Sequence, residues 1–164
     1  MTVRRLRADE AALFRTVRLR ALADAPAAFA HTHAEISAKP DAYWQDMTCS
    51  VTEPEGHAMF VAERAGEPVG MVFGLMDRDR PTRAHLGGMW VDPGARQQGL
   101  GRTLSDAVIG WARERGFADI ALWVTEGNKA AITLYEHLGF TPTGRRDRHP
   151  HRPELSILEM GRPL

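Results

Sequence analysis

The sequence has few of the features that mark specialised protein classes. A single cysteine, Cys49, among 164 residues excludes an internal disulfide and a cysteine-rich zinc site. No run approaches the ~18 consecutive apolar residues of a membrane helix, and no apolar segment follows the basic N-terminus as in a signal peptide. We therefore expect no membrane association and a cytoplasmic location.

The sequence also has no excess of charge of either sign. Lys plus Arg and Asp plus Glu each number 21, so the formal net charge is zero when the histidines are neutral. A protein built mainly to hold nucleic acid usually carries a positive excess, so we expect no nucleic-acid partner. A hydrophobic content of 43% excludes a disordered chain. The length predicts a single domain over residues 1–164.

Hydrophobic periodicity predicts a chain of alternating strands and helices. The predicted strands are Val3–Arg7, Met59–Ala62, Val69–Met76, His85–Val91, Ile120–Val124, Phe140–Gly144 and Leu155–Met160. The first predicted helix is capped by Asp9 and broken at Pro26, and the second, His33–Met47, is interrupted near Pro40. Two further helices are predicted over Gly99–Arg115 and Lys129–Leu138. Hairpins and helical crossovers together indicate an α/β fold, with a mixed sheet of about six to seven strands flanked by about four helices.

Three stretches between or within these elements receive specific predictions. The segments Cys49–Gly56 and Arg145–Pro153 are expected to be loops, because of their proline, glycine and charged residues. His149 and His151 flank Pro150 without a nearby third ligand, which favours a solvated loop over a metal site. Two adjacent glycines, Gly87 and Gly88, inside a predicted strand indicate a bulge.

The most informative stretch follows the strand that ends at Val91. A turn leads into a glycine-spaced segment, which opens the helix that starts near Gly99. The first amides of a helix lack internal partners and lie at the positive end of its dipole. Gly99 and Gly101 let an anion approach the backbone closely, so the segment predicts a phosphate or pyrophosphate site. It contains neither GxxxxGK[ST] nor the full GxGxxG spacing, since Leu104 stands at the last position.

The run Arg96-Gln97-Gln98-Gly99-Leu100-Gly101 resembles the R/Q-x-x-G-x-G/A signature of the GNAT superfamily of N-acetyltransferases. Upstream, a strand ends in Val91-Asp92-Pro93, as in that family. Downstream, Asn128, Tyr135 and Gly139-Phe140 resemble its second motif. The resemblance extends from Val3 to the C-terminus, and both motifs occur at the family's spacing.

The resemblance implies a sheet whose fourth and fifth strands splay apart, with acetyl-coenzyme A in the wedge as cosubstrate and no metal. The backbone near Met89 would hold the acetyl and pantetheine portions, the amides after Arg96 the pyrophosphate, and Asn128 the pantetheine arm. The residues implied to bind the coenzyme are Met89, Trp90, Val91, Arg96, Gln97, Gln98, Gly99, Leu100, Gly101, Arg102, Thr103 and Asn128.

The implied reaction is direct attack of a primary amine on the thioester. The amine must lose a proton, since its pKa is near ~10.4. An amide near Met89 would stabilise the oxyanion. The leaving thiolate needs a proton. Tyr135 matches the family's general acid; its alternative role is to pack its helix on the sheet. His85 stands where the family often has Glu and is the candidate base, with capping of the strand as the alternative. Glu126 and Glu63 are weaker candidates, and water is another.

The acceptor is not defined by the sequence. In this fold it would lie between residues 23–42 and Arg145–Pro153, with Trp90 and Trp123 flanking the wedge. No acidic cluster indicates a polyamine or an aminoglycoside, and a small amine, an amino-acid-like metabolite and a protein amino group stay open. The alternative function is a non-catalytic coenzyme A sensor. The family resemblance also implies that a homodimer is possible.

Overall fold

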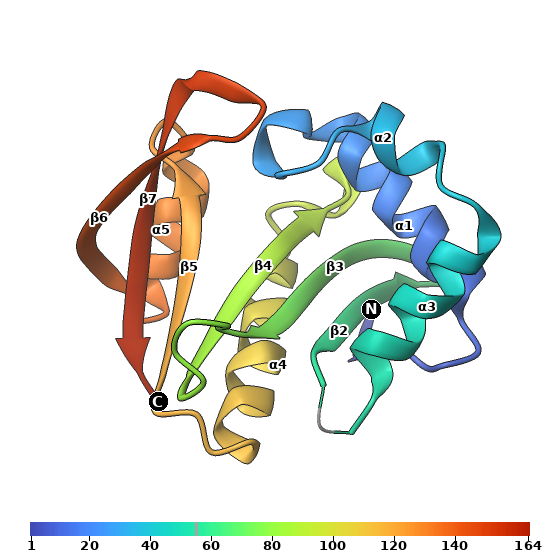
Figure 1. Ribbon diagram of the computed structural model, residues 1–164, viewed down its shortest axis with the longest axis horizontal. Helices are drawn as coiled ribbons and strands as arrows, with labels where there is room; N and C mark the ends of the chain where they lie inside the picture. The colour runs from blue at the N-terminus through green and yellow to red at the C-terminus, as the bar shows by residue number, and fades with distance from the viewer. Residues whose placement is uncertain (55) are drawn as a thin grey trace.

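A computed structural model describes residues 1–54 and 56–164 and shows one seven-stranded sheet (Figure 1). The strands are β1 (Thr2–Arg5), β2 (Ala58–Arg64), β3 (Glu67–Met76), β4 (Arg83–Val91), β5 (Asp119–Thr125), β6 (Thr141–His149) and β7 (Arg152–Pro163). Their order in the sheet is β1-β2-β3-β4-β5-β7-β6. All neighbours are antiparallel except β4 and β5, which are parallel. The predicted mixed sheet is confirmed.

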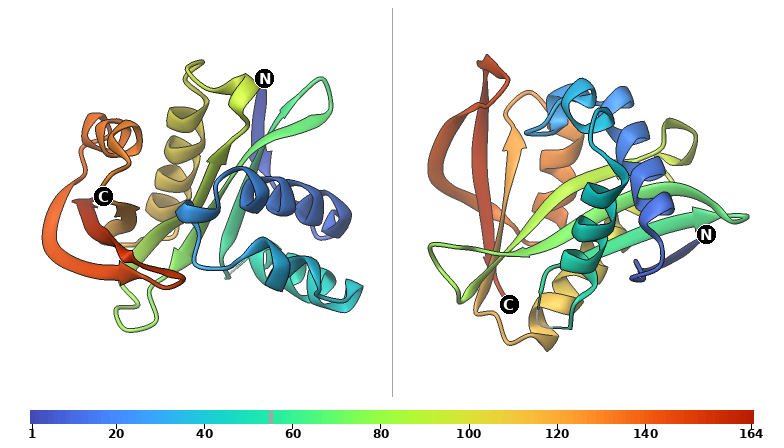
Figure 2. Two further views of the ribbon diagram at one scale, coloured as in Figure 1. Left: turned by 90° about the horizontal axis from the view of Figure 1, so that it is seen from above. Right: turned by 45° about the vertical axis from the view of Figure 1, so that its right-hand side comes forward.

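The described residues form five α-helices and two short 3₁₀ turns. They are α1 (Ala11–Asp24), η1 (Pro26–Ala28), α2 (His33–Ser37), α3 (Asp41–Thr52), η2 (Pro93–Ala95), α4 (Leu100–Glu114) and α5 (Lys129–His137). Helix α4 packs on one face of β1 to β4, and α1 and α3 pack on the other (Figure 2). No helix among the described residues is long and apolar enough to cross a membrane.

The two faces of the sheet carry two separate apolar cores. Leu104, Val108 and Trp111 of α4 lie in the first, together with Ile120 and Leu122 of β5. The second core lies under α1 to α3 and contains Phe14, Val17, Trp44, Met59 and Met71. Because β2 and β3 carry buried residues on both faces, they are the rigid centre from which the rest of the sheet extends.

Helix boundaries in the N-terminal third differ from the sequence prediction. Helix α1 begins at Ala11 with Glu10 as its N-cap, so the prediction of an Asp9 cap is wrong. The Glu10 carboxylate accepts hydrogen bonds from Arg4 and from the Arg7 amide, which fixes the chain just before the helix. The interruption near Pro40 is confirmed, but it separates two helices, and the described chain therefore has five helices and not four.

Both predicted loops are also largely regular structure. The prediction for Cys49–Gly56 is wrong in its first half, because α3 continues to Thr52 and buries Val51; Glu55 lies outside the described residues. The prediction for Arg145–Pro153 is wrong because β6 and β7 extend through it and leave a turn at residues 150 and 151. This hairpin is exposed along β6, so backbone pairing forms it without the apolar alternation that would reveal it in the sequence.

Strands β4 and β5 pair over three residues only and then diverge. The paired positions are Arg83 with Asp119, Ala84 with Ile120, and His85 with Ala121. Beyond them β5 stays paired with β7 through Thr125, while β4 stays paired with β3 through Val91. The predicted splay of the fourth and fifth strands is thus confirmed, and it opens the sheet at its centre (Figure 1).

A network of ion pairs around Arg83 and Glu159 joins four strands of the sheet beside the opening. Arg83 donates to Asp119 at 2.7 Å and to Glu159 at 2.7 Å, and Arg145 lies 2.8 Å from the other Glu159 oxygen. The Glu159 side chain is fully buried. The network therefore ties β4, β5, β6 and β7 together below the opening.

We expect Arg83→Met to lower the free energy of unfolding by about 3 kcal/mol, because it removes one partner of a buried ion pair. Arg80→Met is the matched control, since Arg80 contacts the same Asp119 carboxylate at 3.4 Å but is half exposed. It should cost about 1 kcal/mol or less. Urea unfolding of both variants measures the difference. Equal losses of unfolding free energy would show that the buried ion pairs do not hold these strands together.

Candidate active site

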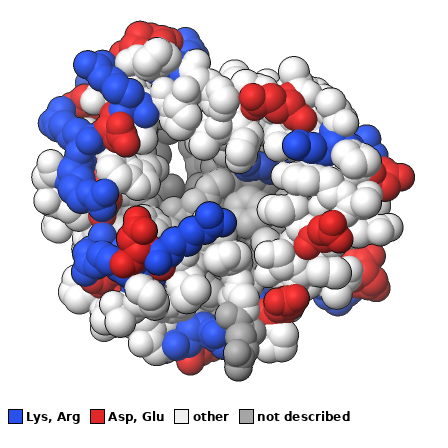
Figure 3. Space-filling view, in the orientation of Figure 1, with Lys and Arg blue, Asp and Glu red and all other residues white. Residues whose placement is uncertain are grey.

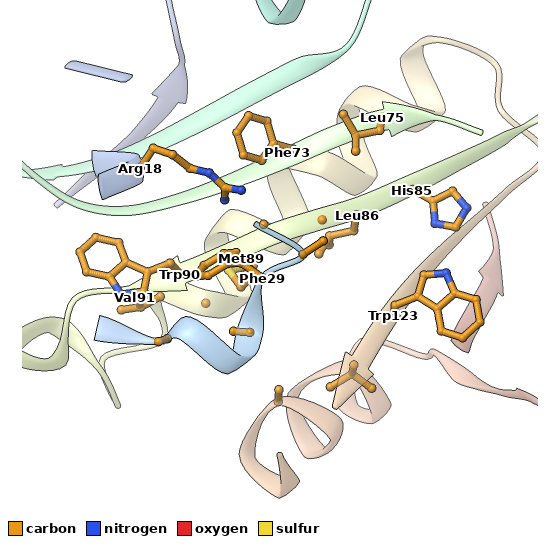
Figure 4. A pocket seen from close by; sticks show the side chains of 18 of the residues that line it. Arg18, Phe29, Phe73, Leu75, His85, Leu86, Met89, Trp90, Val91 and Trp123 are labelled. Carbon is orange, nitrogen blue, oxygen red and sulfur yellow. The ribbon is translucent and has the colours of Figure 1, made fainter. Parts of the chain in front are cut away.

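A large cavity occupies the opening between β4 and β5. Its volume is about 1410 Å³, and it runs from the start of α4 to the residues under α1 and α3. The face of the molecule drawn in Figure 3 is hollowed at its centre, between the β6–β7 hairpin and the helical layer. Figure 4 shows β4 and β5 approaching each other near His85 and Trp123 and separating away from them.

Strand β4 borders the cavity with an irregular edge. Gly87 pairs with Phe73 and Trp90 with Met71, so Gly88 and Met89 together face the single residue Val72. This is the bulge predicted from the paired glycines. Gly88 has a φ of +59°, and a Cβ there would lie 2.5 Å from the Phe73 ring, so only glycine fits. On its other side β4 has no strand partner among the described residues beyond His85, which leaves backbone donors and acceptors facing the cavity.

The N-terminus of α4 faces the same cavity. Gly99 precedes the helix with a φ of +77°, and Gln97 has a φ of +62°, which is unusual for a residue with a side chain. Alternation of left-handed residues turns successive amides toward one side, a backbone arrangement that binds anions. The Thr103 amide is the first in this turn to bond back into the helix, at 3.1 Å to Gly99. The preceding amides are thus available to a ligand.

Most of the residues predicted for the site line this one cavity. They are His85, Met89, Trp90, Val91, Arg96, Gln97, Gly99, Leu100, Gly101, Arg102, Asn128 and Tyr135. Gln98 and Thr103 are not among the lining residues: the Gln98 side chain donates to Gly94, and the Thr103 hydroxyl donates to Gly99.

Arg96, the first residue of the glycine-spaced signature, has its guanidinium engaged by the protein. It donates to the Val91 carbonyl at 2.9 Å and also to the Asp24 carboxylate. Asp24 accepts a further bond from the Trp90 indole at 2.9 Å. The last residue of α1 therefore joins the end of β4 to the signature loop, a tertiary link that no spacing in the sequence indicates.

The two motif residues after β5 lie on α5. The Asn128 carboxamide caps the helix by accepting from the Ala131 amide at 3.2 Å. Tyr135 is buried, with its ring edge against Phe140. Burial raises the pKa of the Tyr135 phenol to about 12, so this group keeps its proton at neutral pH. It can act as a hydrogen-bond donor within the cavity.

His85 is hydrogen-bonded to a carboxylate at the narrow end of the opening. Its Nε2 lies 2.9 Å from an oxygen of Asp77, in the connection between β3 and β4. Burial raises the pKa of the Asp77 carboxyl, but hydrogen bonds from His85 and from the Asp79 and Arg80 amides outweigh it and hold that pKa below its usual range. A carboxylate thus orients the imidazole, an arrangement suited to a proton acceptor. Sequence reasoning did not anticipate Asp77.

The weaker base candidates are held elsewhere. Glu126 pairs with Arg146 at 2.7 Å, and Glu63 pairs with Arg4 at 2.8 Å; neither lines the cavity. His149 is buried and lines the cavity, so the prediction of a solvated histidine is wrong there; the His151 amide in the turn donates to its Nδ1 at 3.3 Å. Among the described residues no group of three or more His, Cys, Asp and Glu side chains is placed to hold a metal ion.

The part of the cavity under α1 and α3 is lined by residues that the sequence analysis did not select. Phe14 and Arg18 come from α1, Phe29 follows η1, and Phe73 comes from β3. The Arg18 guanidinium lies 4.8 Å from the Phe29 ring centre and 5.7 Å from that of Phe73. These residues are far apart in the chain and belong to no motif, so only the fold places them together.

Comparisons with known proteins agree with this geometry. Residues 19–140 match the model of the acetyltransferase (GNAT) family. A mycothiol acetyltransferase of Thermomonospora curvata is 37% identical over 133 residues, which are 81% of this chain and 41% of that protein. A [ribosomal protein bS18]-alanine N-acetyltransferase of Escherichia coli is 34% identical over 128 residues, covering 77% of this chain and 82% of the enzyme.

Solved structures share the fold. A GNAT superfamily phosphinothricin acetyltransferase of Sinorhizobium meliloti, in complex with AcCoA, superposes with a TM-score of 0.81 at 19% identity, covering 99% of this chain and 88% of that one. The chain spans less than half of the length of several curated relatives that it matches. The family model nevertheless covers most of the chain, and residues 19–140 include both motifs. The chain therefore belongs to the acetyltransferase (GNAT) family of acyl-transferring enzymes.

Proposed function

We propose that residues 1–164 form a single N-acetyltransferase domain that transfers an acetyl group from acetyl-coenzyme A to a primary amine. One observation carries the proposal: the bulged, unpaired edge of β4 and the N-terminus of α4 open into the same cavity. The first suits an extended amide-bearing arm and the second suits a pyrophosphate. Acetyl-coenzyme A contains both groups, joined to a reactive thioester.

The residues that line the cavity fit each part of this cosubstrate. An extended pantetheine arm can pair with the open edge of β4 near Met89 and Val91 as an added strand would. The amides from Gln97 to Arg102 are grouped at the positive end of α4, where they suit phosphate oxygens. Gly99 has no protein atom within 4 Å of an added Cβ, so the space over it is open to a ligand.

The acyl-transfer step forms an amide bond and breaks the carbon–sulfur bond, so a proton leaves the amine and a proton reaches the thiolate. His85, oriented by Asp77, accepts the amine proton directly or through water. The Met89 amide in the bulge donates to the oxyanion. Tyr135 donates to the thiolate sulfur, and its raised pKa keeps the donor proton in place before reaction.

The acceptor is the part of the function on which the relatives differ. One curated relative is named for mycothiol and another for the alanine of a ribosomal protein. Release of free thiol from acetyl-coenzyme A in the presence of amines, amino acids, antibiotics and peptides tests the proposal. Saturable release with any acceptor supports it. Silence across the panel while calorimetry shows acetyl-coenzyme A binding would instead favour the non-catalytic sensor.

We expect Tyr135→Phe to lower kcat by roughly 100-fold or more, the usual contribution of a positioned proton donor. The affinity for acetyl-coenzyme A should stay within about threefold, since one hydroxyl is lost and the ring contact with Phe140 remains. Steady-state kinetics and calorimetry measure the two effects. Normal turnover would show that Tyr135 only packs its helix.

We expect Gly101→Glu to weaken acetyl-coenzyme A binding by roughly 100-fold, because a carboxylate would lie beside the pyrophosphate in a low-dielectric site. The new side chain displaces only the flexible end of Leu134, which is 3.1 Å from an added Cβ. Gly110→Glu is the control on the same helix, since it has open space and lies outside the cavity. Equal calorimetric affinities for the two variants would remove the assignment of the pyrophosphate site.

A further inference from the structure

Arg18 is a partly buried cation with one buried hydrogen-bond donor that is unused among the described residues. Its Nη1 atom is inaccessible to solvent and has no hydrogen-bond partner among the described residues. Other arginines near the site are paired: Arg20 with Asp92, and Arg96 with Asp24. Burial lowers the pKa of the Arg18 guanidinium to about 10, so the group stays charged at neutral pH. A buried N–H donor without an acceptor is costly, and a ligand anion would relieve that cost.

The immediate surroundings of Arg18 compensate only part of this cost. The guanidinium contacts the rings of Phe29 and Phe73, which attract cations weakly. Figure 4 shows the side chain extending from α1 beside Phe73, within the cavity. Aromatic rings do not replace a carboxylate as acceptors for the planar, forked set of N–H groups that a guanidinium presents.

The charged side chains that line the cavity are basic, like Arg18. Its charged or titratable lining residues, other than Tyr43 and Tyr135, are Arg18, Arg78, Arg96, Arg102, His31, His57, His85 and His149. The described lining residues include no Asp or Glu. Carboxylates outside the lining already pair with three of these residues: Asp24 with Arg96, Asp77 with His85 and Asp106 with Arg102. A purely cationic acceptor would therefore meet no free negative group. An acceptor with an anionic group would meet basic side chains.

The position of Arg18 relative to β4 sets the geometry of such an acceptor. A Cβ added at Gly88 would lie 3.5 Å from the Arg18 Nη1 atom, so the guanidinium lies against the bulge. The proposed function places the thioester at this bulge. An anion bound by Arg18 would then lie close to the attacking amine. The neighbouring surface is apolar, with Phe14, Phe29 and Trp44 lining the same end of the cavity.

We propose that the acceptor is an α-amino acid with an apolar side chain, and that Arg18 determines this specificity by binding its carboxylate. The inference rests on the proposed N-acetyltransferase function and adds the chemical class of the acceptor. A carboxylate one carbon from the amine matches the guanidinium beside the bulge. The apolar side chain would lie among the aromatic residues under α1 and α3.

The test compares matched acceptors that differ only at the carboxylate. Phenylalanine and leucine are each assayed beside their amides and their decarboxylated amines, with thiol release as the readout. We expect kcat/KM for the amino acids to exceed that for the amides and amines by roughly 100-fold, the scale of a buried charged pair. Arg18→Met should bring this ratio to within about threefold of one, mainly through KM.

Two control variants separate specificity from structure. Arg15→Met lies one turn earlier on α1, where Arg15 pairs with Asp41 at the surface, and should leave the ratio unchanged. Arg18→Lys keeps the charge without the planar fork and should keep part of the preference. Acetyl-coenzyme A affinity, measured by calorimetry, should stay the same in all three variants.

Three outcomes would overturn the inference while leaving the proposed function intact. The first is equal turnover of an amino acid and its amide by the wild-type enzyme. The second is an equal loss with every acceptor in Arg18→Met, which indicates a structural role. The third is no transfer to any of these acceptors while acetyl-coenzyme A still binds. Failure to bind acetyl-coenzyme A at all would instead overturn the proposed function.

Discussion

The short contact between β4 and β5 is the constraint on which the site depends. Three residue pairs join these strands, and beyond them each strand follows a different neighbour. A sheet opened at its centre leaves unpaired backbone groups, which is unfavourable unless they face water or a ligand. Arg83, at the end of β4 that stays paired with β5, donates to the fully buried carboxylate of Glu159 on β7. The same divergence creates the cavity and supplies the backbone edge that an amide-bearing ligand can use.

Two segments beside this opening have left-handed backbone conformations. Gly88 in the bulge and Gln97 before α4 both have positive φ values. A left-handed residue with a side chain costs on the order of 1–2 kcal/mol, and such outliers gather where a fold must aim backbone groups at a ligand. The packing of Phe73 against Gly88 and the bonds of Arg96 to Val91 and Asp24 hold both segments in place. The amides of both segments are thus held in position by contacts within the protein.

The distribution of charge gives the cavity a character that the neutral chain does not show. Acidic groups near the site are each paired with a basic neighbour, as Asp24 is with Arg96, Asp77 with His85 and Asp92 with Arg20. The described surface of the cavity is left with basic, neutral polar and apolar side chains. Zero net charge over the chain therefore coexists with a positive interior, and the field that a substrate meets is set by the cavity alone.

The sequence by itself determined the family, the mixed sheet and the position of the coenzyme motif. Continuous apolar runs reveal central strands such as β3, and the glycine spacing before α4 reflects backbone conformations that few other residues adopt. It did not reveal that β6 and β7 extend through Arg145–Pro153, since backbone pairing forms that part of the hairpin without an apolar pattern. The fold alone brings Asp77 to His85 and places Arg18, whose Nη1 atom has no partner among the described residues, beside Gly88. These contacts join elements distant in the chain, and neither residue type, periodicity nor spacing encodes which side chains meet across a cavity.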